Sequence, residues 1–242
     1  MSEKKVADAK ARIDKRLQQH PSDANALVLG AMVFGTERNF AKSEELLRRA
    51  IDADATQMRA YGMLAQIYLA QNRLEEARIE LEAIARRRPD NVGAATMAAM
   101  ILGQQGRTAD AEKAYAAIVA RNPRAAVASN NLAWAYAERA EMLDQALQLA
   151  QAAKAELPDD PEINDTLAYV YLERKLPALA IPPLRVAIEK QPANPVFRFR
   201  LGQALAASGD PASAKRELES ALKLKPDFPG AQQARELLAT LR

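Results

Sequence analysis

Apolar side chains recur along almost the whole chain at the three- and four-residue spacing of an amphipathic α-helix. These stripes are about 12 to 14 residues long and come in pairs separated by short turns. The pairs repeat with a period of 34 residues, with one residue inserted after the fourth landmark. The landmarks are Pro21, Ala55, Pro89, Pro123, Pro158, Pro192 and Pro226. The pattern predicts an all-α chain built from repeated helix pairs.

Small residues recur at two positions of each repeat when the landmark residue is numbered 32. Position 8 holds Ala31, Ala65, Ala99, Ala133, Ala168 and Gly202, and position 20 holds Ser43, Ala77, Ala111, Ala146, Ala180 and Ala214. Position 11 is bulky: Phe34, Tyr68, Leu102, Tyr136, Tyr171 and Leu205. Small side chains at two facing points predict two antiparallel helices in close contact. At position 34, Asp23, Asn91, Asp160 and Asn194 are suited to capping the next helix.

The repeat boundaries follow from the landmarks. We expect a half repeat over 1–23, full repeats over 24–57, 58–91, 92–125, 126–160, 161–194 and 195–228, and a capping helix over 229–242. The half repeat lacks a first helix, which favours a chain cut from a longer array; a natural start on a lone helix is the alternative. Pro182 and Pro183 fall inside a second helix expected to begin near Pro177, and should kink or delay it.

The period, the small residues at 8 and 20, the bulky residues at 11 and 24 and the proline at 32 resemble the tetratricopeptide repeat (TPR) family. The resemblance covers residues 24–228, although the family's aromatic at position 4 is present only as Tyr61. It implies a right-handed superhelical solenoid of stacked antiparallel helix pairs, about 14 helices forming a single domain over 1–242. It also implies protein binding on a concave groove lined by the first helix of each repeat.

A narrower resemblance rests on the segments 130–134 (Asn-Asn-Leu-Ala-Trp) and 165–169 (Asp-Thr-Leu-Ala-Tyr). They are similar to the C-terminal region of bacterial TPR proteins linked to exopolysaccharide and exosortase systems. This likeness implies an envelope-associated scaffold. The compartment stays open: periplasm or envelope if the parent chain is exported, and cytoplasm otherwise.

Composition narrows the classes of function. The chain has no Cys, and His20 is its single histidine, so thiolate chemistry and histidine clusters are excluded. No Gly-rich phosphate loop or other catalytic motif is present, and the carboxylate pairs Glu44-Glu45 and Glu75-Glu76 suit helix starts. We therefore expect no enzyme, cofactor or metal. The net charge of +3 and the lack of a long apolar run predict neither nucleic-acid binding nor a transmembrane segment.

The predicted ligand-binding residues occupy positions 5, 6, 9 and 12 of the first helices. They are Val28, Met32, Gln66, Leu69, Met100, Asn130, Asn131, Trp134, Asp165, Tyr169, Phe199, Arg200 and Gln203. The first half of this surface is rich in methionine, and the second half is aromatic and hydrogen-bonding. Repeat 126–160 carries two basic residues against six acidic ones, which suits a peptide with apolar anchors and a basic flank. The alternative is that Trp134 and Tyr169 are core residues that replace the missing aromatic at position 4.

The leading hypothesis is a non-enzymatic scaffold that binds a peptide or a partner helix in this groove. Members of the family that clamp a C-terminal carboxylate carry Lys at position 5 and Asn at position 9, and this chain has neither there. Two alternatives stay open. One is the recognition arm of a larger envelope polysaccharide-assembly or glycosyltransferase machine. The other is a structural array that forms homo-oligomers through its ends.

Overall fold

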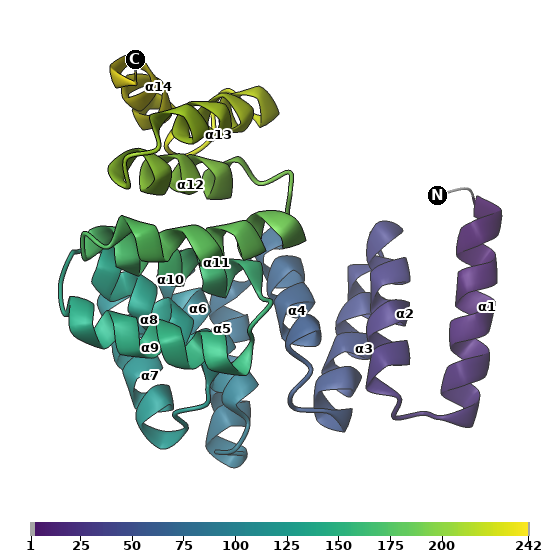
Figure 1. Cartoon of the computed structure of the whole chain (residues 1–242). Coiled ribbons are helices and arrows are strands. Elements are labelled where there is room, and N and C mark those ends of the chain that lie inside the picture. Colours follow the sequence, from purple (N-terminus) through teal and green to yellow (C-terminus); the bar gives the residue numbers. More distant parts are fainter. Residues whose placement is uncertain (1–2, 242) are drawn as a thin grey trace. The chain divides into compact units, whose positions relative to one another are not determined.

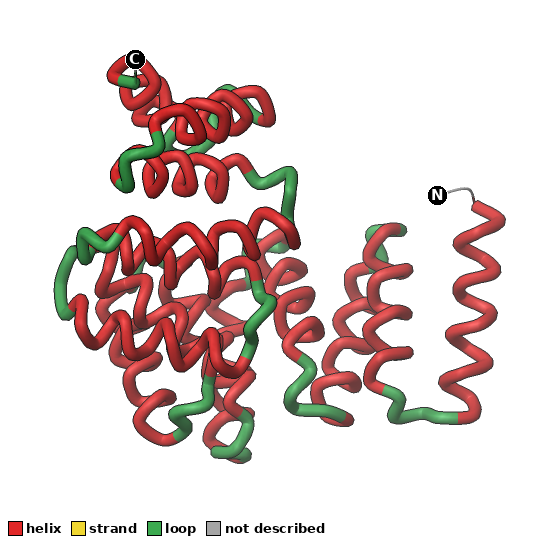
Figure 2. Tube along the Cα trace, viewed as in Figure 1, coloured by secondary structure: helices red, strands yellow, loops and turns green. Residues whose placement is uncertain are grey.

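The computed structural model describes residues 3–241, apart from the side chains of residues 3–7, 58 and 69. Over this range the chain forms fourteen α-helices joined by short turns and contains no strand (Figures 1 and 2). The helices are α1 (Glu3–Gln19), α2 (Ala24–Thr36), α3 (Phe40–Ala53), α4 (Met58–Ala70), α5 (Leu74–Arg87), α6 (Val92–Gln104), α7 (Thr108–Arg121), α8 (Ala126–Glu138), α9 (Leu143–Glu156), α10 (Pro161–Glu173), α11 (Pro177–Lys190), α12 (Pro195–Ala207), α13 (Pro211–Leu224) and α14 (Ala231–Thr240). The all-α prediction and the helix number are confirmed.

The chain divides into two compact units, residues 1–114 and residues 115–242, and the boundary falls inside α7. In the first unit, one core of Leu, Ile, Tyr and Ala side chains extends from α2 to α6. In the second unit, the apolar clusters lie between α10 and α13 and between α12 and α14. The grouping of all 242 residues into one domain stays a prediction from the sequence.

Four helix starts are capped by the side chains that the sequence predicts. The side chains of Asp23, Asn91, Asp160 and Asn194 each accept a backbone N–H from the first turn of the following helix, at 3.0 Å. Such a bond satisfies one of the donors that a helix start leaves unpaired. At these four boundaries the landmark that ends a second helix and the cap two residues later separate one repeat from the next.

The small residues at positions 8 and 20 form the contact between the two helices of a repeat. Eleven of the twelve are buried, and Ala65 is half-buried. In the first full repeat the hydroxyl of Ser43 donates to the carbonyl oxygen of Ala31 at 2.8 Å. In the last, a Cβ placed on Gly202 would lie 2.6 Å from Cγ of Leu218. Because no larger side chain fits such a contact, these positions set the helix spacing.

Tyr61, the single aromatic at position 4, links two repeats of the first unit. It is fully buried, and its hydroxyl donates to Oδ1 of Asn91 at 2.6 Å. The same oxygen caps α6 by accepting the N–H of Ala94. A Cβ on Gly93 would lie 2.6 Å from Cε2 of Tyr61, so the ring lies directly against the start of α6.

Pro182 and Pro183 lie inside α11, which begins at Pro177 as predicted and continues to Lys190. The two prolines therefore neither delay nor end the helix. Pro183 is buried, and Leu184 beside it is fully buried. Packing of this face against neighbouring helices compensates for the backbone hydrogen bonds that the prolines cannot make.

Candidate functional site

Two aromatic rings stack on the first helices of the second unit. Trp134 on α8 and Tyr169 on α10 occupy position 9 of consecutive repeats, and their helices pack against each other. The ring centroids lie 4.8 Å apart with an angle of 33° between the ring planes. Both side chains are half-buried. This contact agrees with the prediction that the two rings face the same side of adjacent repeats.

Arg200 of α12 completes this arrangement. Its guanidinium carbon lies 4.9 Å from the centroid of the Trp134 ring and 5.1 Å from that of Tyr169. The same guanidinium donates from Nη1 to Oδ2 of Asp165 on α10. Aromatic faces attract a cation through their quadrupole, and the carboxylate adds a charged hydrogen bond. We call Trp134, Asp165, Tyr169 and Arg200 the Trp134 cluster.

Buried acceptors without partners lie at the Trp134 cluster and on the neighbouring helix. Asp165 is only 4% exposed, and its Oδ1 has no hydrogen-bond partner among the described residues. The same holds for Oδ1 of Asn130, at the equivalent position of α8, and for Oγ of Ser129 beside it. Burial raises the pKa of Asp165, and Arg200 offsets only part of that rise. An unpaired buried acceptor is costly, so it is informative when several lie close together in the fold.

Other predicted residues of this unit differ in their burial. Asn131 and Gln203 are half-buried, and Asn131 is hydrogen-bonded to Tyr115, whose pKa burial raises to about 12. Phe199 is 6% exposed and packs against Phe228, with ring centroids 5.8 Å apart. Phe199 therefore belongs to the core at the C-terminal end rather than to an open surface.

The predicted residues of the first unit form no comparable cluster. Val28 is a core residue, Met100 is half-buried and Gln66 is exposed. Met32 is 37% exposed, and its sulfur accepts a hydrogen bond from Arg59 at 3.0 Å. The side chain of Leu69 lies outside the described residues.

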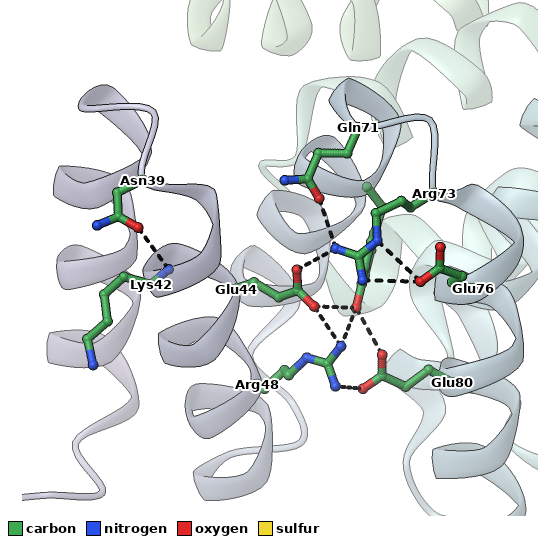
Figure 3. A network of polar contacts seen from close by, with 9 residues as sticks. Asn39, Lys42, Glu44, Arg48, Gln71, Arg73, Glu76 and Glu80 are labelled. Atoms are coloured by element: carbon green, nitrogen blue, oxygen red, sulfur yellow. Dashed lines mark hydrogen bonds and ion pairs between the residues drawn. The ribbon is translucent and has the colours of Figure 1, made fainter.

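A polar network that sequence analysis did not foresee lies in the first unit instead (Figure 3). The hydroxyl of Tyr68 accepts from Arg48 and donates to Glu80, both at 2.9 Å. Glu44 accepts from Arg48 at 2.6 Å and from Arg73 at 2.9 Å, and Arg48 also pairs with Glu80. Burial and the bond to Glu80 raise the pKa of Tyr68, so its hydroxyl stays protonated. We call these five side chains the Tyr68 network.

The Tyr68 network connects α3, α4 and α5, and none of its side chains has a buried polar atom without a partner. Only the Glu44–Arg48 pair, spaced four residues apart on one helix, could have been seen in the sequence. Glu44 was expected to serve the helix start, and the structure shows it bonding to two arginines. The network therefore has a structural role, and the Trp134 cluster is the candidate binding site.

Metal binding and membrane spanning have no visible basis in the part of the chain that the structure describes. No group of three or more His, Asp or Glu side chains there is placed to hold a metal ion. Among the same residues, no helix has both the length and the apolar character needed to cross a bilayer.

Comparison with known proteins agrees with the helix-pair architecture. One family model, described as tetratricopeptide repeat, matches residues 36–101 and 171–241, and a second model of the same description matches residues 96–161. No curated protein sequence matches the chain.

Many solved structures share the fold. One is the APC/C hetero-tetramer Cut9-Hcn1, at 13% identity and a TM-score of 0.69, with 98% of this chain aligned; the chain spans 46% of that chain's length. A second is a tetratricopeptide repeat protein from Parabacteroides merdae, at 14% identity and a TM-score of 0.53, covering 97% of this chain and 91% of that one. A third is a thermophilic TPR protein in Thermus thermophilus, at 21% identity and a TM-score of 0.55, covering 75% and 99%.

At such identities these structures show the fold alone. The family models, in contrast, match well over half of the sequence. This match agrees with the buried small residues, the capped helix starts and the regular helix pairs described above. The chain belongs to the tetratricopeptide repeat family.

Proposed function

We propose that this chain is a non-catalytic scaffold that binds a peptide segment or a partner helix along the concave face of its first helices. Tetratricopeptide repeats generally mediate protein–protein interactions. The observation that supports a site on α8 and α10 is the stacked pair Trp134 and Tyr169, half-buried at the same position of adjacent repeats.

Such a pair is suited to anchoring a partner. Aromatic rings bring a large contact area and lose few rotamers on binding, which makes Trp and Tyr frequent hot spots of interfaces. Here the two rings also hold each other in place, so part of the ordering cost is met before a partner arrives. In the first unit, Leu29 and Met32 supply further exposed apolar surface on α2.

The experiment compares the wild-type protein with the double variant Trp134→Ala plus Tyr169→Ala in a selection of displayed peptides. We expect the variant to lose recovery of the selected peptides by about 100-fold or more, because hot-spot truncations cost about 2 kcal/mol or more each. Melting curves of both proteins show whether the variant is folded.

The matched control removes two exposed apolar side chains from second helices, Ile79→Ala plus Leu179→Ala, each 52% exposed. This control should select the same peptides as the wild-type protein. A folded Trp134→Ala plus Tyr169→Ala variant that still selects them would overturn the proposal. Glycan recognition within a larger machine and homo-oligomer formation stay predictions from the sequence.

A further inference from the structure

We infer that the Trp134 cluster is a receptor for an arginine side chain of the partner peptide, and that Arg200 occupies this receptor as an internal stand-in until a partner arrives. The inference rests on the proposed function and adds the chemistry of the ligand.

The receptor has the parts that a guanidinium requires. Arg200 shows that a guanidinium fits, with its central carbon 4.9 Å and 5.1 Å from the two ring centroids and a hydrogen bond to Asp165. A planar guanidinium can stack on a ring while its N–H groups bond to a carboxylate in the ring's surroundings. Lysine offers the charge but not the flat fork of donors, so arginine is the better ligand.

Arg200 leaves the receptor partly unsatisfied. An ionised carboxylate can accept from both of its oxygens, yet Arg200 bonds only to Oδ2 of Asp165, and Oδ1 has no partner. Oδ1 of Asn130, at the same position of the adjacent repeat, has none either. Arg200 is tethered to α12 and approaches from one side. A ligand arginine has no such tether, so it can donate to Oδ1 of Asp165, which Arg200 leaves without a partner.

The charge around the receptor favours a basic ligand over an acidic one. Burial and the nearby Asp165 raise the pKa of Glu162. Burial also raises the pKa of Tyr169, and the negative charges of Glu173 and Glu138 add to that rise. The repeat that contains Trp134 has two basic residues against six acidic ones. An incoming carboxylate would meet this acidic surrounding, whereas an arginine is attracted to it.

Exchange of one guanidinium for another avoids a large penalty. Removing the partner of a buried charge is strongly unfavourable, but a ligand arginine would take over Asp165 as Arg200 leaves. The Arg200 side chain is 13% exposed and long enough to turn towards solvent. Arg200 therefore acts as a competitor that lowers the affinity for weak ligands and keeps Asp165 paired in their absence.

The test uses Trp134 as its reporter, because it is the only tryptophan of the chain. The probes are a capped peptide with one arginine between leucine anchors, and its twin in which citrulline, uncharged and similar in shape, replaces arginine. We expect the arginine peptide to change the Trp134 emission and to bind at least about ten-fold more tightly than the citrulline peptide. In Asp165→Asn the preference for the arginine peptide should shrink, because the carboxylate that accepts from the guanidinium is gone while the two rings remain.

Removal of Arg200 should strengthen binding of the arginine peptide. If Arg200 had only a structural role, its removal would weaken that binding. In Arg200→Gln the arginine peptide should bind about ten-fold more tightly than to the wild-type protein, while the citrulline peptide should be unaffected. If a single variant does not fold by circular dichroism, Asp165→Asn plus Arg200→Gln removes both charges together. This double variant should discriminate between the two peptides less than the wild-type protein does.

Three results would overturn the inference: equal binding of the two peptides to the wild-type protein, weaker binding of the arginine peptide to Arg200→Gln, or tighter binding of a twin with glutamate. Equal binding of the two peptides to the wild-type protein, together with loss of displayed-peptide selection by Trp134→Ala plus Tyr169→Ala, would leave the proposed function standing. If that double variant is folded and selects the same displayed peptides as the wild-type protein, both the proposed function and this inference are wrong.

Discussion

The Tyr68 network and the Trp134 cluster contain the same kinds of side chain but differ in their hydrogen bonding. Each places an arginine over an aromatic ring: Arg73 lies 5.1 Å from the Tyr68 centroid, and Arg200 lies 4.9 Å from the Trp134 centroid. Each pairs an arginine with a carboxylate. In the Tyr68 network every buried polar atom has a partner, whereas in the Trp134 cluster an oxygen of Asp165 has none. The two regions therefore resemble each other in composition and differ in how completely their buried polar atoms are hydrogen-bonded.

The position within the repeat explains the contrast. Tyr68 occupies position 11, where its fully buried ring meets charged side chains from two second helices. Trp134 and Tyr169 occupy position 9 and stay half-buried. A closed network adds rigidity between repeats, while an incomplete one keeps hydrogen-bonding capacity for a ligand.

The largest expected effect comes from removing Arg200, and removal of Arg48 from the Tyr68 network is the matched comparison. Arg200→Ala leaves the carboxylate of Asp165 buried and unpaired, and should lower the free energy of unfolding by about 3–5 kcal/mol. Arg48→Ala should cost about 1 kcal/mol or less, because its side chain is 42% exposed and Glu44 and Glu80 keep Arg73 and Tyr68 as partners. Urea unfolding followed by circular dichroism measures both. Equal losses of unfolding free energy in the two variants would contradict the difference between the two regions.

The closed character of the Tyr68 network is tested by deleting its central hydroxyl. Tyr68→Phe should lower the free energy of unfolding by about 1.5–3 kcal/mol, because the hydroxyl bonds to charged groups in a buried place. The control is Tyr171→Phe, whose hydroxyl accepts only a long 3.4 Å contact from Gln151 at the surface. That change should cost about 0.5 kcal/mol or less. Similar losses in the two variants would show that the hydrogen bonds of the Tyr68 hydroxyl do not stabilise the folded protein.

Acid should act on the two regions with opposite sign. Burial acts to raise the pKa of Glu44, but bonds from Arg48 and Arg73 outweigh it and hold that pKa below the usual value. The stability that Glu44 contributes is therefore present above pH 4.5 and is lost as the pH falls through the lowered pKa. Burial raises the pKa of Asp165, so its contribution is complete below pH 3.8 and is lost as the pH rises through the raised pKa.

The measurement is the difference in melting temperature between the wild-type protein and each neutral variant from pH 7 to pH 3. The advantage of the wild-type protein over Glu44→Gln should shrink on acidification, and its standing relative to Asp165→Asn should improve. Parallel curves for the two variants would contradict the contrast.

The smallest effect is expected at a pair with good geometry in open solvent. Arg124 donates two hydrogen bonds to Glu156, at 2.8 Å and 2.9 Å, but its side chain is 80% exposed. Arg124→Ala should change the free energy of unfolding by about 0.5 kcal/mol or less. Glu156→Gln serves as the partner control. A cost comparable to that of Arg200→Ala would mean that geometry, and not burial, sets the difference between the regions.

The repeat architecture can be predicted from the sequence alone, because the signals that specify it are local. The small residues at positions 8 and 20, such as Ala31 and Ser43, predicted the helix contacts that the structure contains. The caps at position 34 predicted the helix starts, since a cap bonds within one turn of its own helix. The sequence also shows that Trp134 and Tyr169 occupy the same position of consecutive repeats.

The contacts of those side chains depend on the tertiary structure. Arg200 meets Asp165 from 35 positions away, and Tyr68 meets Arg48 and Glu80 from two other helices. Phe199 was expected on the binding surface, yet the C-terminal end buries it. Spacing along a chain specifies which face of a helix a residue occupies. The partner found there depends on how neighbouring repeats stack and on which rotamers the packing leaves free, and neither is written in any single repeat.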